Sequence, residues 1–345
     1  MNPLALAVGT RRRAPCPTRR STLVTWAQQA CCAAVSSLLL LGGALAEDLR
    51  LAVSRGPVSL PIYVAEAKGY FEREGIAVRL RDCDSGRACF QLLAQGQAEV
   101  ATAAELLVTL DSFARADTAI IATLSASMHH IKLVAYRGAG IQAPDNLRGK
   151  RIATVAGSSA QYFLDSWLVF HDIDPKDVAI VALAPDQLAG ALARREVDAV
   201  AIWEPIASAA IAALGQDALV LPSPRIYTQH FSLIAPRPVI ARRQADLIKL
   251  LRALARAQRF IAEQPVPAAQ LLTLRLPGAA GLDKLSEHDF RLTLDQSLIA
   301  TMDGQARWAT RQGLVPAGHP SDNLLHSIEP SLLRKAVPGS VSLVQ

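Results

Sequence analysis

Four short polar stretches of the chain have the composition of a binding site for an anionic or polar ligand. Each is rich in serine or other small residues, follows an apolar run and precedes a helical pattern: residues 54–59, 85–87, 103–105 and 157–159. Such loops present hydroxyls and backbone N–H groups, and the N-terminus of a helix carries partial positive charge. Serine and glycine at a single helix start are usually only caps, but their recurrence in this order predicts one shared cleft.

The sequence lacks the motifs of the common catalytic sites. It contains no G-x-S-x-G, no H-E-x-x-H, no P-loop and no dinucleotide-binding fingerprint. His129 and His130 are adjacent, so their side chains diverge on a helix or a strand, which disfavours a metal site. We therefore expect a binding protein with no catalytic residues, no metal and no cofactor, although a triad assembled from distant residues would escape this search.

The first 46 residues have the features of a secretory signal peptide. Five arginines without any acid precede an apolar run at 30–41, and Ala44-Leu45-Ala46 forms an A-x-A pattern that predicts cleavage after Ala46. A membrane anchor is the alternative, but this run falls short of the ~20 residues that span a bilayer. No cysteine follows it directly, which argues against lipid anchoring. Arg19-Arg20 resembles a twin-arginine signal, except that Thr22 stands where phenylalanine is preferred, so both export routes stay open.

The net charge gives little support for a nucleic-acid partner. The whole chain carries 36 basic and 30 acidic residues, a formal charge of +6. Loss of the five arginines of the signal segment leaves 31 basic residues against 30 acidic ones, so the remainder is close to neutral. A basic stripe at positions 249, 252, 256 and 259 lies on one helical face, which we interpret as a solvated surface rather than a DNA contact.

Two of the five cysteines remain after signal cleavage. Cys83 and Cys89 are six residues apart, and an oxidising compartment would permit a disulfide between them. Two free thiols are the alternative, because this separation does not ensure the required approach of the Cα atoms. A metal site is disfavoured, because no partner histidine or cysteine lies nearby in the sequence.

Strand and helix patterns alternate along the chain. Residues 47–137 predict a first α/β lobe and residues 138–232 a second one. A strand at 231–235 marks the return to the first lobe, which residues 233–315 complete with helices expected over 241–263, 268–276, 288–302 and 305–313. Residues 316–345 are rich in proline, serine and glycine and are expected to form a loosely packed tail.

Residues 61–76, PIYVAEAKGYFEREGI, resemble the opening signature of solute-binding proteins of the nitrate, sulfonate and taurine ABC-importer family, which has thiamine-precursor-binding relatives. The resemblance continues through 85–86 and 92–100, through 145–159, and through the stretch EVDAVAIWEP at 196–205. It covers about 49–315. It implies the type II periplasmic binding protein fold, an α/β architecture whose two lobes are joined by a two-strand hinge and close on a ligand.

The same resemblance implies ligand contacts on five segments. By position these are Ser59, Leu60, Ser85, Gly86, Ala104, Glu105, Ser158, Ser159, Trp203 and Glu204. Trp203 could stack on a ligand or pack between the lobes. Glu204 could meet a cationic or hydroxyl group, or could cap the helix after Pro205. Glu105 stands where the family more often has small neutral residues, so a simple inorganic anion is a poorer ligand unless Arg55 or Arg87 offsets its charge.

The resemblance implies a periplasmic solute-binding component of an ABC importer, which captures a small organic solute and presents it to a permease in the inner membrane. We expect a monomer. Two alternatives stay open: a ligand-sensing partner of a membrane receptor, and an enzyme or binder for a pyrimidine-type thiamine precursor. The sequence does not separate import from sensing, since both need only closure and a docking surface.

Overall fold

A computed structural model describes residues 47–223, 225–276, 285–316 and 323–343. The expected signal peptide and its cleavage site lie outside the described residues. Residues Asp48–Gln345 form one compact unit. Within the described part of the chain, every helix is too short or too polar to cross a membrane.

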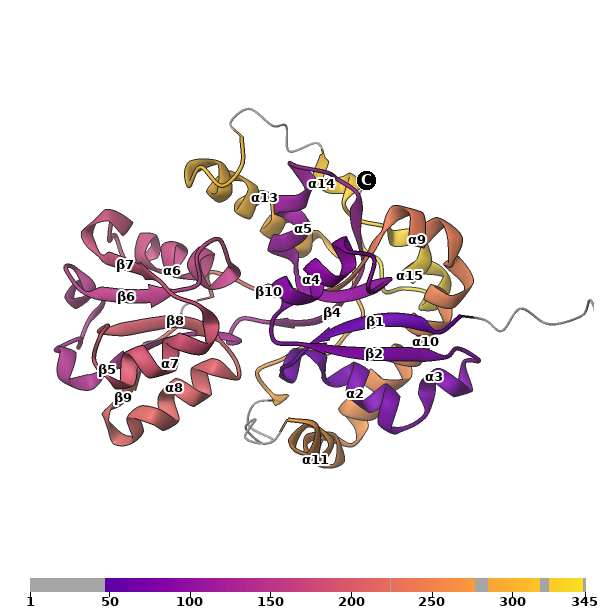
Figure 1. The fold of residues 1–345 in the computed structure, drawn as a ribbon, viewed down its shortest axis with the longest axis horizontal. Helices are drawn as coiled ribbons and strands as arrows, with labels where there is room; N and C mark the ends of the chain where they lie inside the picture. The colour runs from indigo at the N-terminus through magenta and orange to yellow at the C-terminus, as the bar shows by residue number, and fades with distance from the viewer. Residues whose placement is uncertain (1–46, 224, 277–284, 317–322, 344–345) are drawn as a thin grey trace, which may run out of the picture. The chain divides into compact units, whose positions relative to one another are not determined.

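The first sheet has five strands in the order β2-β1-β3-β10-β4 (Figure 1). Its strands are β1 (Leu49–Ser54), β2 (Val78–Cys83), β3 (Val100–Ala104), β4 (Thr118–Ser127) and β10 (Gln229–Pro236). β1 is parallel to β2 and β3, whereas β10 is antiparallel to both β3 and β4. The apolar sequences of β1, β3, β4 and β10 are almost fully buried, as expected of strands covered on both faces. The edge strand β2 is largely exposed or half-buried.

Helices cover both faces of this sheet (Figure 1). α2 (Leu60–Ala67), α3 (Tyr70–Arg73), α10 (Gln244–Glu263) and α11 (Pro265–Arg275) lie on one side. α4 (Gly86–Ala94), α5 (Glu105–Ser112) and α13 (Gln296–Arg311) lie on the other. The remaining helices of this part of the chain are α9 (Arg237–Arg242), α14 (Asn323–His326) and α15 (Pro330–Ala336).

The second sheet has the order β7-β6-β8-β5-β9. Its strands are β5 (Ile131–Tyr136), β6 (Arg151–Thr154), β7 (Ala179–Ala182), β8 (Ala199–Trp203) and β9 (Ala218–Val220). β6 is parallel to β7 and β8, and β5 is antiparallel to β8 and β9. α6 (Ser159–Phe170) lies on one side, and α7 (Pro185–Ala193) and α8 (Ile206–Leu214) on the other (Figure 1).

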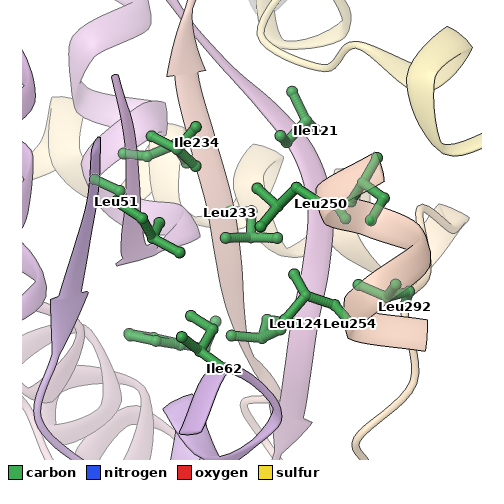
Figure 2. Close-up of a cluster of buried hydrophobic side chains, with 14 of the residues drawn as sticks. Leu51, Ile62, Ile121, Leu124, Leu233, Ile234, Leu250, Leu254 and Leu292 are labelled. Atoms are coloured by element: carbon green, nitrogen blue, oxygen red, sulfur yellow. The ribbon is translucent and has the colours of Figure 1, made fainter. Parts of the chain in front are cut away.

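Each sheet has its own hydrophobic core. The cluster around the first sheet includes Leu233 of β10 with Leu250 and Leu254 of α10, all without exposed area (Figure 2). The cluster around the second sheet includes Phe163 and Trp167 of α6. Two separate cores with a sheet in each confirm the α/β architecture expected from the sequence, and they agree with a two-lobe type II fold.

The chain passes between the two sheets twice. β4 ends at Ser127 and β5 begins at Ile131 in the second sheet, so the first crossing lies at residues 128–130. The return lies between β9, which ends at Val220, and β10, which begins at Gln229. The lobe boundaries remain a prediction. For the first boundary, which the sequence predicted after residue 137, the membership of β5 in the second sheet favours residues 128–130.

The C-terminal part differs from the expectation in two places. One helix, α13, replaces the two expected over 288–302 and 305–313. The chain before it is extended, because Asp289 and Thr293 bridge to β4. The helix then begins after Asp295, whose side chain accepts from the N–H groups of Ser297 and Leu298. The described part of the tail is not loosely packed. Leu332 and Leu333 of α15 are fully buried in the first core, which accounts for the order of this segment.

Candidate ligand-binding site

A cavity of about 160 Å³ is lined by residues that come from both sheets and from the loops that follow their strands. The lining residues are Ser54, Arg55, Val58, Ser85, Gly86, Arg87, Ala104, Leu106, Leu107, His130, Val155, Ser158, Ser159, Pro185, Trp203, Glu204, Gln229 and Phe231. One part of the wall is polar and positively charged, and the rest is mainly apolar.

The N-terminus of α4 forms the first polar part of the wall. Ser85 caps this helix, because its hydroxyl accepts a 3.2 Å hydrogen bond from the N–H of Ala88. Gly86 allows the helix to approach β3 closely: a Cβ at this position would lie 3.2 Å from the Cα of Ala103. The backbone N–H groups of the first turn therefore lie beside the cavity, where they favour an anion.

The N-terminus of α6 forms the second polar part. The hydroxyl of Ser158 caps the helix and donates a 2.7 Å hydrogen bond to the carbonyl of Val155. The guanidinium of Arg87, from α4, donates a 2.8 Å hydrogen bond to the carbonyl of Gly157 in the loop before α6. Arg87 thus places a positive charge beside both helix starts, and no carboxylate of the described residues pairs with it. This arrangement is suited to an oxyanion.

Apolar side chains form the remaining wall. They are Val58, Leu106, Leu107, Val155, Pro185, Trp203 and Phe231. Surfaces of this kind bind the organic body of a ligand by burial of apolar area and by contact with aromatic rings. A wall that is anion-binding on one side and apolar elsewhere is better matched to an organic anion than to an inorganic one.

Glu204 is the one acidic residue among the described residues of the cavity wall, and a helix start and a cation shared with Glu287 lie beside it. It is 2% exposed, and its Oε2 accepts a 3.0 Å hydrogen bond from the N–H of Ser208 in the first turn of α8. Its Oε1 lies 3.8 Å from the Nζ of Lys132. This geometry favours the capping role for Glu204, although the side chain also borders the cavity.

His130 contributes a neutral side chain to the wall. Burial, together with the neighbouring His288 and Lys132, holds its pKa well below the usual value. Its Nδ1 lies 3.3 Å from the Nε2 of His288, so one ring donates to the other. His130 therefore adds no positive charge to the cavity near neutral pH.

The family model described as NMT1/THI5-like matches residues 56–268, which hold most of both sheets and nearly the whole cavity wall. The chain belongs to this family. Among relatives of known name, a Bacillus subtilis (strain 168) protein assigned to the binding of aliphatic sulfonates is 30% identical over 179 residues, 50% of this chain and 54% of its own length. The taurine-binding periplasmic protein of Escherichia coli (strain K12) is 29% identical over 177 residues, 51% of this chain and 53% of its own length. The chain spans about half the length of the curated relatives it matches.

Solved structures share the fold of this NMT1/THI5-like protein. The alkanesulfonate-binding protein SsuA from Xanthomonas axonopodis pv. citri, solved with bound MOPS, superimposes with a TM-score of 0.69 at 17% sequence identity. The match covers 82% of this chain and 98% of that one. At this identity the likeness concerns the fold, which is that of periplasmic binding proteins.

Seven of the ten positions expected from the family resemblance lie together in the cavity wall: Ser85, Gly86, Ala104, Ser158, Ser159, Trp203 and Glu204. Ser59 and Leu60 do not, because both are fully buried behind it, and the hydroxyl of Ser59 donates a 2.7 Å hydrogen bond to the carbonyl of Ser54. The first loop contributes Ser54, Arg55 and Val58 to the wall instead.

Glu105 also lies outside the cavity wall, contrary to its expected place. Its side chain is fully buried, and its carboxylate accepts hydrogen bonds from the hydroxyl of Tyr227 (2.7 Å), the Nε2 of Gln305 (2.6 Å) and the N–H of His230 (2.9 Å). Burial raises its pKa to about 7, and these hydrogen bonds oppose the shift. The carboxylate therefore joins distant segments of this NMT1/THI5-like protein.

The ten expected contacts leave out eleven lining residues. Four of them lie in polar stretches that the sequence indicated: Ser54, Arg55, Val58 and Arg87. Seven lie outside those stretches: Leu106, Leu107, His130, Val155, Pro185, Gln229 and Phe231. Arg55 and Arg87 lie in loops that the sequence did indicate, and only their direction was unknown. Gln229 and Phe231 lie at the start of the return strand β10, where no motif marks them.

Cys83 and Cys89 are joined by a disulfide, with their Cα atoms 5.5 Å apart. Cys83 is the last residue of β2, and Cys89 lies in the second turn of α4. The bond closes a loop that contains Ser85 and Gly86. It therefore restrains the polar loop at the α4 side of the cavity in this NMT1/THI5-like protein.

Proposed function

We propose that the protein is the periplasmic solute-binding component of an ABC importer for a small organic anion of the sulfonate, nitrate or taurine type. One observation carries the proposal: a single cavity has two helix N-termini and the Arg87 guanidinium on one side and apolar side chains on the rest. The names of the two curated relatives support it, as does the match to the NMT1/THI5-like family model.

The proposed cellular route follows from the N-terminal sequence. Residues 1–46 act as a signal peptide that is cleaved after Ala46, and the remainder works in the periplasm as a monomer. Its partners are the solute and an inner-membrane permease. Mass determination of the protein purified from the periplasm checks this route, since cleavage elsewhere, or retention of the segment, contradicts it.

Binding is proposed to couple to closure of two lobes about the crossings at 128–130 and 221–228. The anionic group of the solute lies at the starts of α4 and α6, one from each lobe, so both helices gain from the same charge. Closure removes water from the apolar wall and strengthens the electrostatic interaction inside. The solute thus favours the closed state because it binds that state more tightly than the open one.

The experiment is thermal unfolding of the purified protein with nitrate, alkanesulfonates, taurine, aromatic carboxylates and pyrimidines. A ligand that binds only the folded state stabilises it by ~2.7 kcal/mol at a hundred times its dissociation constant. We expect the midpoint to rise with organic anions and to stay unchanged with pyrimidines. A rise with pyrimidines alone, or with no solute of the panel, contradicts the proposal.

A further inference from the structure

Gln229 has an unusual environment in the cavity wall. It is the first residue of β10, directly after the return crossing, and only 5% of its surface is exposed. Its Nε2 donates a 2.8 Å hydrogen bond to the hydroxyl of Ser159 in the first turn of α6. Its Oε1 is buried and has no hydrogen-bond partner among the residues that the structure describes. The amide is therefore fixed at one end and unsatisfied at the other.

A second buried glutamine shows what a purely structural amide is like in this protein. Gln258, which is 8% exposed, donates from Nε2 to the carbonyl of Leu124 (3.0 Å) and accepts at Oε1 from the N–H of Leu292 (2.8 Å). Both ends of Gln258 are satisfied, as is usual for buried polar groups. The buried carbonyl of Gln229 lacks the partner that Gln258 has, and Gln229 belongs to the cavity wall.

Several other polar groups of this wall are engaged within the protein. The hydroxyls of Ser85 and Ser158 are engaged in caps, and Glu204 accepts from the N–H of Ser208. Leaving a buried acceptor unpaired is unfavourable, so a group that enters the cavity with a hydrogen-bond donor is favoured over one without it.

We propose that the Oε1 of Gln229 accepts a hydrogen bond from the solute, and that the solute is an anion whose body carries a neutral hydroxyl or amide N–H. This inference rests on the proposed function. A neutral donor is preferred to an ammonium group, because Glu204, the acidic residue of the wall, already has the Nζ of Lys132 at 3.8 Å and the start of α8 beside it. Through Ser159, Gln229 also ties the bound solute to α6.

Two isosteric probes test the inference: 2-hydroxyethanesulfonate and 1-propanesulfonate. They differ only by a hydroxyl in place of a methyl group. Titration calorimetry on the purified protein is expected to show binding of the hydroxy compound that is tighter by about 3- to 10-fold, the range of one net hydrogen bond. In Gln229→Leu the preference is expected to vanish or to reverse.

Gln258→Leu is the matched control, since it removes an equally buried but satisfied amide. We expect it to lower the midpoint of thermal unfolding and to leave the preference between the probes unchanged. Gln229→Leu, which removes an unsatisfied acceptor, is expected to affect the ligand-free midpoint less.

The outcomes separate the inference from the proposed function. Equal binding of both probes by the unaltered protein, or a preference that survives in Gln229→Leu, overturns the inference and leaves the proposed function standing. If neither sulfonate binds, the proposal of a sulfonate-type solute is wrong, and the inference about Gln229 is wrong with it. The comparison of the two probes needs no variant, so a failure of Gln229→Leu to fold does not prevent the test.

Discussion

The hydroxyl of Tyr227 donates a 2.7 Å hydrogen bond to the carboxylate of Glu105, across 122 positions of sequence. Tyr227 lies in the return crossing and packs in the core of the second sheet, whereas Glu105 begins α5 directly after β3 of the first sheet. Gln305 of α13 donates to the same carboxylate. One buried acid therefore holds the crossing, α5 and α13 together without a positively charged partner among its hydrogen bonds.

The first prediction concerns the pH dependence of folding. Burial raises the pKa of Glu105 from 4.5 to about 7 in the folded protein. Because the folded pKa is higher than the unfolded one, the contribution of Glu105 is fully present below the unfolded pKa and is lost as pH rises through the folded one. Between pH 4.5 and about pH 7, we expect the titration of Glu105 to lower the free energy of unfolding by about 3 kcal/mol.

Glu105→Gln is expected to remove this part of the slope when urea unfolding is measured from about pH 4.5 to pH 8. Glu99→Gln is the control, because Glu99 is equally buried but is paired with the guanidinium groups of Arg242 and Arg243 at 2.9 Å. It should destabilise the protein and leave the part of the slope that comes from Glu105 in place. A slope that persists unchanged in Glu105→Gln would show that another group is responsible.

The second prediction concerns the contact between α13 and α6. The indole Nε1 of Trp308 donates a 2.7 Å hydrogen bond to Oδ2 of Asp165, and burial raises the pKa of that carboxyl. Trp308→Phe removes the donor and leaves Asp165 with Gln312 alone. We expect a loss of about 1–3 kcal/mol in the free energy of unfolding, largest at pH values where Asp165 is ionised.

The control for this variant is Trp167→Phe. The indole of Trp167 donates a 2.9 Å hydrogen bond to the carbonyl of Pro222, which does not titrate. The loss of stability in Trp167→Phe should therefore not follow the ionisation of Asp165, while the loss in Trp308→Phe should increase as that carboxyl ionises. Parallel pH profiles for the two variants would argue against a role for the Asp165 charge.

The sequence predicts the sheets better than the contacts between distant segments. Alternating strand and helix patterns are local, so the two α/β lobes and the return strand at 231–235 could be predicted. Glu105 meets Gln305 across 200 positions and His230 across 125, and no local pattern indicates either partner. The apolar stretch before α13 shows the limit of periodicity: it suggested a helix, but Thr293 pairs with β4 in extended conformation.

The residues of the cavity wall could be predicted only in part, because a local pattern does not show which side of a loop faces inward. Serines and glycines at helix starts are visible in a sequence, and Ser85, Gly86, Ser158 and Ser159 do lie in the wall. Which side of a loop faces inward depends on packing, so the sequence singled out Ser59 within the stretch 54–59, whereas Ser54 lies in the wall. Gln229 comes from a strand that returns from the second sheet, and its place depends on the topology of both sheets.

The third prediction concerns the disulfide. Replacement of Cys83 and Cys89 by serine opens a short loop, and loop-closure entropy alone gives a loss of about 2 kcal/mol in the free energy of unfolding. Because this loop carries Ser85 and Gly86, affinity for organic anions should fall as well. Urea unfolding and calorimetry of the double variant measure the two effects. If the midpoint of urea unfolding is unchanged in both the double variant and the reduced protein, the predicted loss of stability is wrong.

The fourth prediction concerns the charge at the anion-binding end of the cavity. Arg87→Met removes the guanidinium but keeps much of the apolar stem, and it deletes the hydrogen bond to the carbonyl of Gly157. Hydrogen bonds to charged groups contribute about 1.5–3 kcal/mol, so binding of organic sulfonates should weaken by about tenfold or more and become less sensitive to salt.

Arg79→Met is the matched control for Arg87→Met. Arg79 is an exposed arginine that pairs with Asp48 at 3.0 Å and is not part of the cavity wall, so its loss should leave affinity unchanged. Arg87→Lys restores the positive charge without the planar fork and should recover part of the affinity. If Arg87→Met binds sulfonates as tightly as Arg79→Met does, the anion does not lie between the starts of α4 and α6, and the orientation proposed for the solute is wrong.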